Sequence, residues 1–232
     1  ICRNLKYYID LQINYMISSK IQSIKQNIGE NITLVAVSKT KPIEMIVEAM
    51  QKGHLDFGEN KVQELVEKHE KLPKEIKWHM IGHLQRNKVK YIAPFVHLIH
   101  GADSERLINE INKQGEKNNR IIDCLLQFHI AQETTKFGFN MEEVNEIIKS
   151  NKFKEWGNVN IRGVMGMATF TNDKSQVKTE FESLKLYFDD ISKQINSDSF
   201  NIISMGMSGD YKIAIECGSN MLRIGSSIFG AR

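Results

Sequence analysis

The feature that most constrains the fold is a regular alternation of strand-like and helix-like segments along the chain. Short apolar runs are each followed by a stretch with helical periodicity, and turn residues separate the two. The predicted strands are residues 32–38, 55–58, 77–81, 96–100, 121–128, 161–165, 200–204 and 221–224. Eight strand–helix units are the number that closes a parallel barrel.

The intervening helices are predicted at residues 42–52, 61–69, 86–91, 104–117, 141–149, 174–195 and 211–217, with Ser104 as an N-cap. A further helical pattern runs from Leu5 to Ile28 and ends at Gly29, ahead of the first strand. We therefore predict an α/β fold, a (β/α)8 TIM barrel with an extra N-terminal helix, as a single domain over residues 1–232. A doubly wound open sheet is the alternative, but no G-x-G-x-x-G turn follows the first strand.

Composition limits the possible partners. The net charge is only +3, and both signs are interspersed, which argues against nucleic acid. No apolar run approaches the roughly 20 residues that span a bilayer, so no membrane partner is expected. Cys2, Cys124 and Cys217 offer neither a disulfide framework nor a C-x-x-C pair, which indicates a reducing, cytoplasmic setting. Because the chain starts at Ile1 and not at Met, a targeting segment upstream of it, and therefore localisation to an organelle, is the alternative.

Chemically informative residues follow several predicted strands, where barrels place their chemistry. Lys39 closes the apolar first strand, and partial desolvation there favours a neutral, nucleophilic amine that can form a Schiff base with an aldehyde. A strand-end lysine that simply reaches water is the alternative. Glycines and hydroxyls follow the last two strands, at 204–210 and 223–227, and such loops form anion cradles. An aldehyde-seeking lysine together with a phosphate site points to pyridoxal phosphate.

Five ordered segments carry a resemblance to a known family. They are VAVSKTKP (35–42), FGENKVQEL (57–65), WHMIGHLQRNK (78–88), KFGF (136–139) and SMGMSGDYKIAIECGSNMLRIGSSIFG (204–230). Together they resemble the pyridoxal-phosphate homeostasis proteins (the YggS/PROSC group), which share the barrel of the alanine racemase N-terminal domain. The resemblance covers nearly the whole chain from about residue 30.

The resemblance implies the cofactor-binding residues Lys39, Asn60, His79, Met165, Ser208, Arg223, Gly225 and Ser226. Lys39 would carry the Schiff base, with Lys41 as the competing candidate. Ser208 and the backbone of Gly225 and Ser226 would hold the phosphate, with Ser227 as a helper.

The same resemblance implies finer roles inside the barrel. Arg223 would face the pyridine nitrogen; a guanidinium cannot accept a proton, so it would weaken the ring as an electron sink. Asn60 and His79 would hydrogen-bond the ring or a water beside it. Met165, Met205 and Met207 would pack around it. Lys136 would assist ligand transfer, with a solvated loop lysine as the alternative. His79 and His83 straddle a strand end, so no metal site is predicted.

The function implied is homeostasis of pyridoxal 5'-phosphate: a carrier and buffer, not an enzyme, holding the cofactor as an internal aldimine at Lys39 and supplying apo-enzymes. We expect a monomer, because the chain stops at Arg232 without the second domain that supplies a tyrosine base in the racemases. The main alternative is an amino-acid racemase or decarboxylase of the same fold, with Tyr211 or His83 as second base. A barrel aldolase that uses the lysine without a cofactor is a further alternative.

Overall fold

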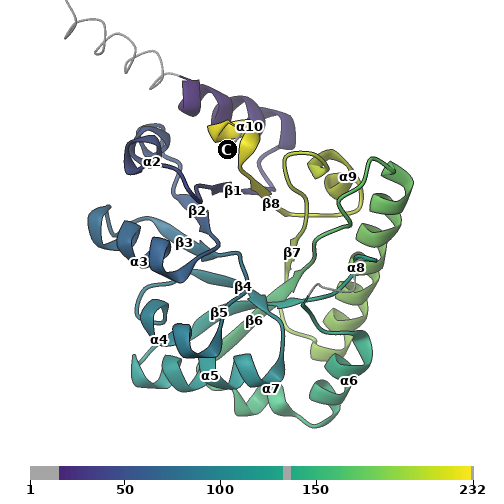
Figure 1. The fold of residues 1–232 in the computed structure, drawn as a ribbon. Coiled ribbons are helices and arrows are strands. Elements are labelled where there is room, and N and C mark those ends of the chain that lie inside the picture. The colour runs from purple at the N-terminus through teal and green to yellow at the C-terminus, as the bar shows by residue number, and fades with distance from the viewer. Residues whose placement is uncertain (1–15, 133–136, 231–232) are drawn as a thin grey trace, which may run out of the picture.

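The computed structural model describes residues 16–132 and 137–230, and these form a closed parallel barrel. The strands pair in chain order from β1 to β8, and β8 pairs with β1, so no strand edge is left open. Figure 1 shows the strands at the centre with helices around them. The predicted (β/α)8 barrel is confirmed.

The strands are β1 (Thr33–Val37), β2 (Asp56–Glu59), β3 (Lys77–Met80), β4 (Leu98–Ala102), β5 (Ile122–Gln127), β6 (Val159–Met165), β7 (Ile202–Ser204) and β8 (Met221–Ile224). The helices are α2 (Ile43–Met50), α3 (Val62–Lys71), η1 (Arg86–Lys88), α4 (Val89–Ile92), α5 (Glu105–Lys117), α6 (Met141–Lys149), α7 (Lys152–Glu155), α8 (Lys174–Ile195), α9 (Tyr211–Glu216) and α10 (Ser226–Phe229). A helix at 16–28 precedes β1; the remainder of the predicted leading helix lies outside the described residues.

Two predicted details need correction. The fourth strand begins at Leu98 and not at residue 96, because Val96 still donates its N–H to Ile92 O at the end of α4. Ser104 occupies the N-cap position of α5, but its hydroxyl bonds Asp103 and makes no capping bond.

Side-chain alternation along the strands produces two apolar layers. The larger layer lies between strands and helices and includes Phe57, Trp78 and Phe181. A smaller cluster fills the barrel interior and contains Val35, Leu98, Leu125, Met165 and Met221. Among the described helices, none has both the length and the apolar character needed to cross a membrane.

Candidate functional site

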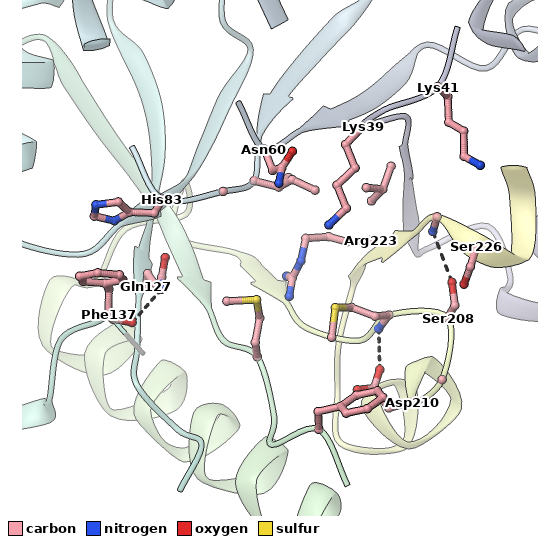
Figure 2. Close-up of a pocket in the computed structure, with 18 of the residues that line it drawn as sticks. Lys39, Lys41, Asn60, His83, Gln127, Phe137, Ser208, Asp210, Arg223 and Ser226 are labelled. Atoms are coloured by element: carbon pink, nitrogen blue, oxygen red, sulfur yellow. Dashed lines mark hydrogen bonds between the residues drawn. The ribbon is translucent and has the colours of Figure 1, made fainter. Parts of the chain in front are cut away.

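A cavity with a volume of about 750 Å³ lies at the carboxyl ends of the strands. That size suits a small organic ligand. Six of the residues predicted to bind a cofactor line it: Lys39, Asn60, Ser208, Arg223, Gly225 and Ser226. Figure 2 shows these side chains arranged around the cavity, contributed by both ends of the chain.

Lys39 follows β1, and its place is fixed by the residues on either side. Thr40 adopts a left-handed conformation with φ of 63°, which is costly for a β-branched residue and turns the chain sharply after the lysine. The Thr40 N–H donates to Glu64 Oε1 at 2.6 Å. Figure 2 shows the Lys39 side chain directed into the cavity toward Arg223.

A buried ionic cluster lies behind this turn. Lys68 donates to Ser38 O at 2.8 Å, to Glu59 Oε1 at 2.7 Å and to Glu64 Oε1 at 2.7 Å. The Ser38 hydroxyl donates to the same Glu59 oxygen at 2.6 Å. Burial raises the pKa of Glu59, and the positive charge of Lys68 opposes that rise. The cluster therefore ties the backbone on both sides of Lys39 to α3.

Lys41, the competing candidate, is held differently. Its Nζ donates to Gly230 O at 3.2 Å, which ties the loop after β1 to the end of α10. Lys41 also lines the cavity, but Figure 2 shows its side chain apart from those of Lys39 and Arg223. This geometry favours Lys39 over Lys41 as the amine that serves the cavity.

The loop after β7 and the turn after β8 meet at Ser208. The Ser208 hydroxyl accepts from the N–H of Gly225 at 3.3 Å and of Ser227 at 3.4 Å. These hydrogen bonds are long and weak, so the hydroxyl and both N–H groups remain available to an incoming anion. Gly206 makes the turn possible with φ of 97°, and an added Cβ there would lie 2.6 Å from Ala214 Cβ.

Asp210 closes the same loop by accepting from the Met207 N–H at 2.5 Å. Burial raises the pKa of Asp210, although that hydrogen bond and the charge of Arg223 act against the rise.

Arg223 projects from β8 into the barrel and is 4% exposed. Its guanidinium donates to Ser204 O at 2.8 Å, to Ser204 Oγ at 2.6 Å and to Gly166 O at 3.0 Å. Burial lowers the pKa of Arg223 to about 10, and Asp210 acts in the opposite direction. The group stays cationic at neutral pH and can only donate hydrogen bonds to a ligand in the cavity.

Polar and aromatic side chains line the remaining wall of the cavity. His83 stacks on Phe137 with ring centroids 4.2 Å apart, and its Nδ1 lies 2.9 Å from Asp103 Oδ2. Gln127 donates to Phe137 O at 2.7 Å. Phe170, also at the cavity, is almost fully exposed.

Two predicted site residues lie away from the cavity. His79 faces the barrel interior one layer below, with Nδ1 2.9 Å from His100 Nε2 and Nε2 3.2 Å from Asp56 Oδ1, so both nitrogens bond the protein. Met165 belongs to the inner apolar cluster, while Met167 and Met207 line the cavity. Neither residue lines the cavity, because both side chains are buried inside the barrel.

Two other residues that the sequence analysis considered for the site, Tyr211 and Met205, do not line the cavity. Tyr211 lines a separate surface pocket and not the main cavity, and Met205 packs in the outer layer. Lys136 lies outside the described residues.

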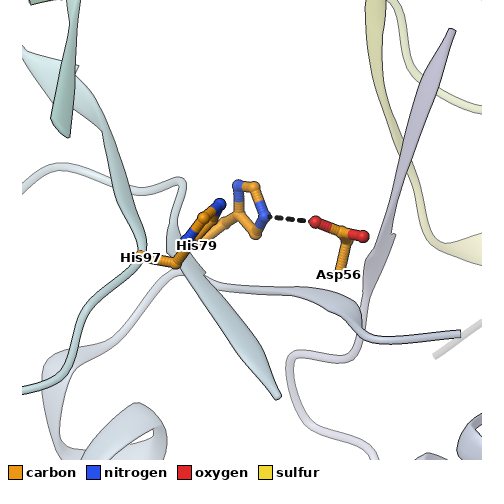
Figure 3. Close-up of side chains that lie close together, drawn as sticks. All are labelled: Asp56, His79 and His97. Carbon is orange, nitrogen blue, oxygen red and sulfur yellow. Dashed lines mark hydrogen bonds and ion pairs between the residues drawn. The ribbon is translucent and has the colours of Figure 1, made fainter. Parts of the chain in front are cut away.

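At the other end of the barrel, Asp56, His79 and His97 bring potential metal-ligand atoms within 4.8 Å of one another, as Figure 3 shows. Partial burial, with the charges of His79 and Lys77, lowers the pKa of His97. The donor types suit a transition metal. However, His97 is exposed, Lys77 adds positive charge, and His79 Nε2 is already engaged by Asp56.

Two features of the structure were not predicted from the sequence. Lys68 is buried on an amphipathic helix, and only its i, i+4 spacing from Glu64 hinted at an ion pair. His100 and Ser204 carry no local motif, and their contact joins residues 104 positions apart.

The alanine racemase N-terminal domain family model matches residues 15–232. The pyridoxal phosphate homeostasis protein of Aquifex aeolicus is 38% identical over 206 residues, covering 88% of this chain and 89% of that protein. The human protein of the same name is 36% identical over 210 residues, covering 86% and 76%.

A solved structure of PipY from Synechococcus elongatus PCC7942 with PLP bound superposes with a TM-score of 0.85 at 27% identity. The match covers 92% of this chain and all of that one.

Proposed function

The chain belongs to the pyridoxal phosphate homeostasis protein family, and we propose that its barrel binds and buffers pyridoxal 5'-phosphate at Lys39. The observation that carries the proposal is the convergence of Lys39, Arg223 and the Ser208 loop on one cavity. A primary amine, a guanidinium and a cluster of hydroxyl and N–H donors are the groups that an anionic, aromatic aldehyde requires. The residues present therefore fit the cofactor.

The cofactor would supply an aldehyde that bonds reversibly to a primary amine, a covalent link that is nevertheless exchangeable. Lys39 provides that amine, and the ion cluster around Lys68 keeps it aimed into the cavity. Ser208, Gly225 and Ser226 would receive the phosphate, with Ser227 N–H as a further donor. Asn60 lines the cavity at the end of β2 and offers an amide to the ring.

Arg223 would limit what the bound cofactor can do. A guanidinium can donate but not accept a proton, so a pyridine nitrogen that faces it stays unprotonated. An unprotonated ring withdraws electrons poorly, which disfavours carbanion chemistry. This property supports storage of the cofactor over turnover.

The racemase alternative needs a second base opposite the lysine. Within the described part of the chain, no tyrosine lines the cavity. His83 does line it, but its Nδ1 bonds Asp103 and its ring stacks on Phe137. The carrier function is therefore the one we adopt, as the family name also indicates.

Delivery of the cofactor to apo-enzymes, a monomeric state and a cytoplasmic setting are further parts of the proposal. Light scattering on the purified chain tests the monomer. Mixing the loaded protein with an apo pyridoxal phosphate enzyme, and comparing its reactivation with that by free cofactor, tests delivery.

A spectroscopic titration tests binding. Adding pyridoxal 5'-phosphate to the protein should produce a saturable absorbance band, and Ser208→Ala should weaken the affinity roughly three- to tenfold through a lost phosphate hydrogen bond. Incubation of the loaded protein with L- and D-alanine then separates the classes, because a carrier leaves each enantiomer unchanged. Steady racemisation would reject the carrier function, and an absence of saturable binding would reject the whole proposal.

A further inference from the structure

A continuous chain of hydrogen bonds crosses the barrel interior from the cavity to the opposite end. Arg223 Nη1 donates to Ser204 Oγ at 2.6 Å, and Ser204 Oγ lies 3.0 Å from His100 Nδ1. His100 Nε2 lies 2.9 Å from His79 Nδ1, and His79 Nε2 lies 3.2 Å from Asp56 Oδ1. Five strands contribute one residue each, and only Asp56 reaches solvent.

The two ends of this chain favour one direction for the bonds between them when both imidazoles are neutral. Arg223 can only donate, and an ionised Asp56 can only accept. Burial alone would raise the pKa of Asp56, but the hydrogen bond to His79 and nearby positive charges outweigh it and lower the pKa, so Asp56 is a carboxylate.

With both imidazoles neutral, the three groups between accept on the Arg223 side and donate on the Asp56 side. Ser204 donates to His100 Nδ1, and both histidines carry their single proton on Nε2. Burial is the main cause that lowers the pKa of His100 well below its usual range, and the charge of Arg223 acts in the same direction, which keeps this imidazole neutral. The opposite order would face the lone pair of a neutral His79 with the Asp56 carboxylate.

Arg223 needs such support because its charge is buried among neutral partners. Its hydrogen bonds go to Ser204 and to the carbonyl of Gly166. The charge of Asp210 favours the cation, but within the described residues no carboxylate lies in ion-pair range of the guanidinium. A buried charge without compensation is costly. Aligned hydrogen bonds polarise one another, so the chain connects the guanidinium to the distant carboxylate.

We propose that Ser204, His100, His79 and Asp56 are positioning residues that orient Arg223 toward the ligand and give it a remote counter-charge. The effect on the cofactor rests on the proposed function, whereas the proton order is a property of the protein alone. Figure 3 shows Asp56 at its end of the chain, beside His79. A substitution at Asp56, the residue of the chain most remote from the cavity, should therefore change the environment of the Arg223 guanidinium.

The proton order is read first, without any ligand. Long-range 1H–15N correlation on protein with 15N-labelled histidine should show His79 and His100 as neutral imidazoles protonated on Nε2 at neutral pH. His69, outside the chain, serves as an assignment control through His69→Ala. An Nδ1-protonated or doubly protonated form of either residue would overturn the proposal.

Stoichiometric zinc chloride added to the same sample tests the competing use of the Asp56, His79 and His97 cluster. Metal binding at His79 Nε2 would require the proton to leave that atom and the whole order to reverse. The expected result is that the His79 and His100 signals do not change. Zinc-dependent shifts of both, lost in His97→Ala, would overturn the proposed order in favour of a metal site.

Transmission along the chain is tested with two matched variants. Asp56→Asn keeps an oxygen acceptor but removes the charge, while Asp123→Asn makes the same change at the same end of the barrel, where Asp123 pairs with Arg162 at 2.8 Å and not with the chain. The guanidinium 15N signals of Arg223 should shift in Asp56→Asn and stay in place in Asp123→Asn. Equal changes of the Arg223 guanidinium signals in the two variants, or no change in either, would overturn the proposal.

Cofactor release gives the functional readout. Ser204→Ala removes the first link and should speed the loss of bound pyridoxal 5'-phosphate about tenfold, and Asp56→Asn roughly threefold. Asp123→Asn should stay within about twofold of the parent. If the parent chain binds no cofactor, the proposed function fails while the histidine spectra still decide the proton order. Unchanged release in Ser204→Ala, with binding intact, would refute the positioning role.

Discussion

Lys68→Met is the substitution that most sharply tests how the turn at Lys39 is held. The Lys68 and Glu59 side chains are 6% and 0% exposed, and their charged atoms lie 2.7 Å apart. Removing the amine leaves the Glu59 carboxylate buried, with the Ser38 hydroxyl as its remaining hydrogen-bond donor among the described residues. Breaking a buried ion pair from one side costs about 3–5 kcal/mol, and we expect a loss of that size in the free energy of unfolding.

Urea denaturation of the parent and the variant measures this loss. Lys71→Met is the matched control, because Lys71 lies on the same helix and pairs with Glu67 at 2.6 Å, but both side chains are more than half exposed. The free energy of unfolding of Lys71→Met should not differ measurably from that of the parent. Adding Glu59→Gln to Lys68→Met removes the unpaired charge and should recover about 1–2 kcal/mol.

The pH dependence has a definite sign. Burial already raises the pKa of Glu59, and loss of Lys68 removes the main opposing charge, so the folded-state pKa rises further above the unfolded one. A raised carboxyl pKa stabilises the folded state at low pH and loses that contribution as pH rises through the folded value. The deficit of Lys68→Met should therefore be larger at pH 8 than at pH 5. A deficit below about 1 kcal/mol, or one equal to that of Lys71→Met, would refute the reasoning.

Two further predictions concern single residues. Burial lowers the pKa of His54 from 6.5 to about 4, so the unfolded chain takes up a proton first and stability falls as pH drops through this window. The loss should reach about 3 kcal/mol below pH 4, and urea midpoints for His54→Leu should show less acid sensitivity; equal sensitivity contradicts the assignment. Gly206→Ala should cost about 2 kcal/mol or more, because φ is 97° and the new Cβ meets Ala214, whereas Gly209→Ala, with open space, should cost little. Similar thermal midpoints for these two variants would contradict the packing argument.

The barrel could be predicted from the sequence because each strand is a short apolar run and each helix is amphipathic. α6, α8 and β8 begin and end at the predicted residues. The four-residue helix α7 was not predicted, since it follows a left-handed Asn151 and has no apolar periodicity of its own.

The predicted cofactor-binding residues that follow strand ends line the cavity, whereas those within strands are divided: Arg223 lines it, and His79 does not. Lys39, Asn60 and Ser208 reach the cavity because barrel strands all point their carboxyl ends to one face. His79 lies a layer deeper, and its partners His100 and Asp56 depend on how β2, β3 and β4 align. That register is a tertiary property, which no local pattern in one sequence specifies.

The central claim is that the Lys39 amine is the attachment point for the cofactor. It is tested most directly by borohydride reduction of the protein mixed with pyridoxal 5'-phosphate, followed by mass spectrometry of the peptides. The account predicts one dominant modified residue, Lys39, and loss of the stable adduct in Lys39→Ala but not in Lys41→Ala. A dominant adduct on Lys41, or undiminished modification in Lys39→Ala, would contradict it.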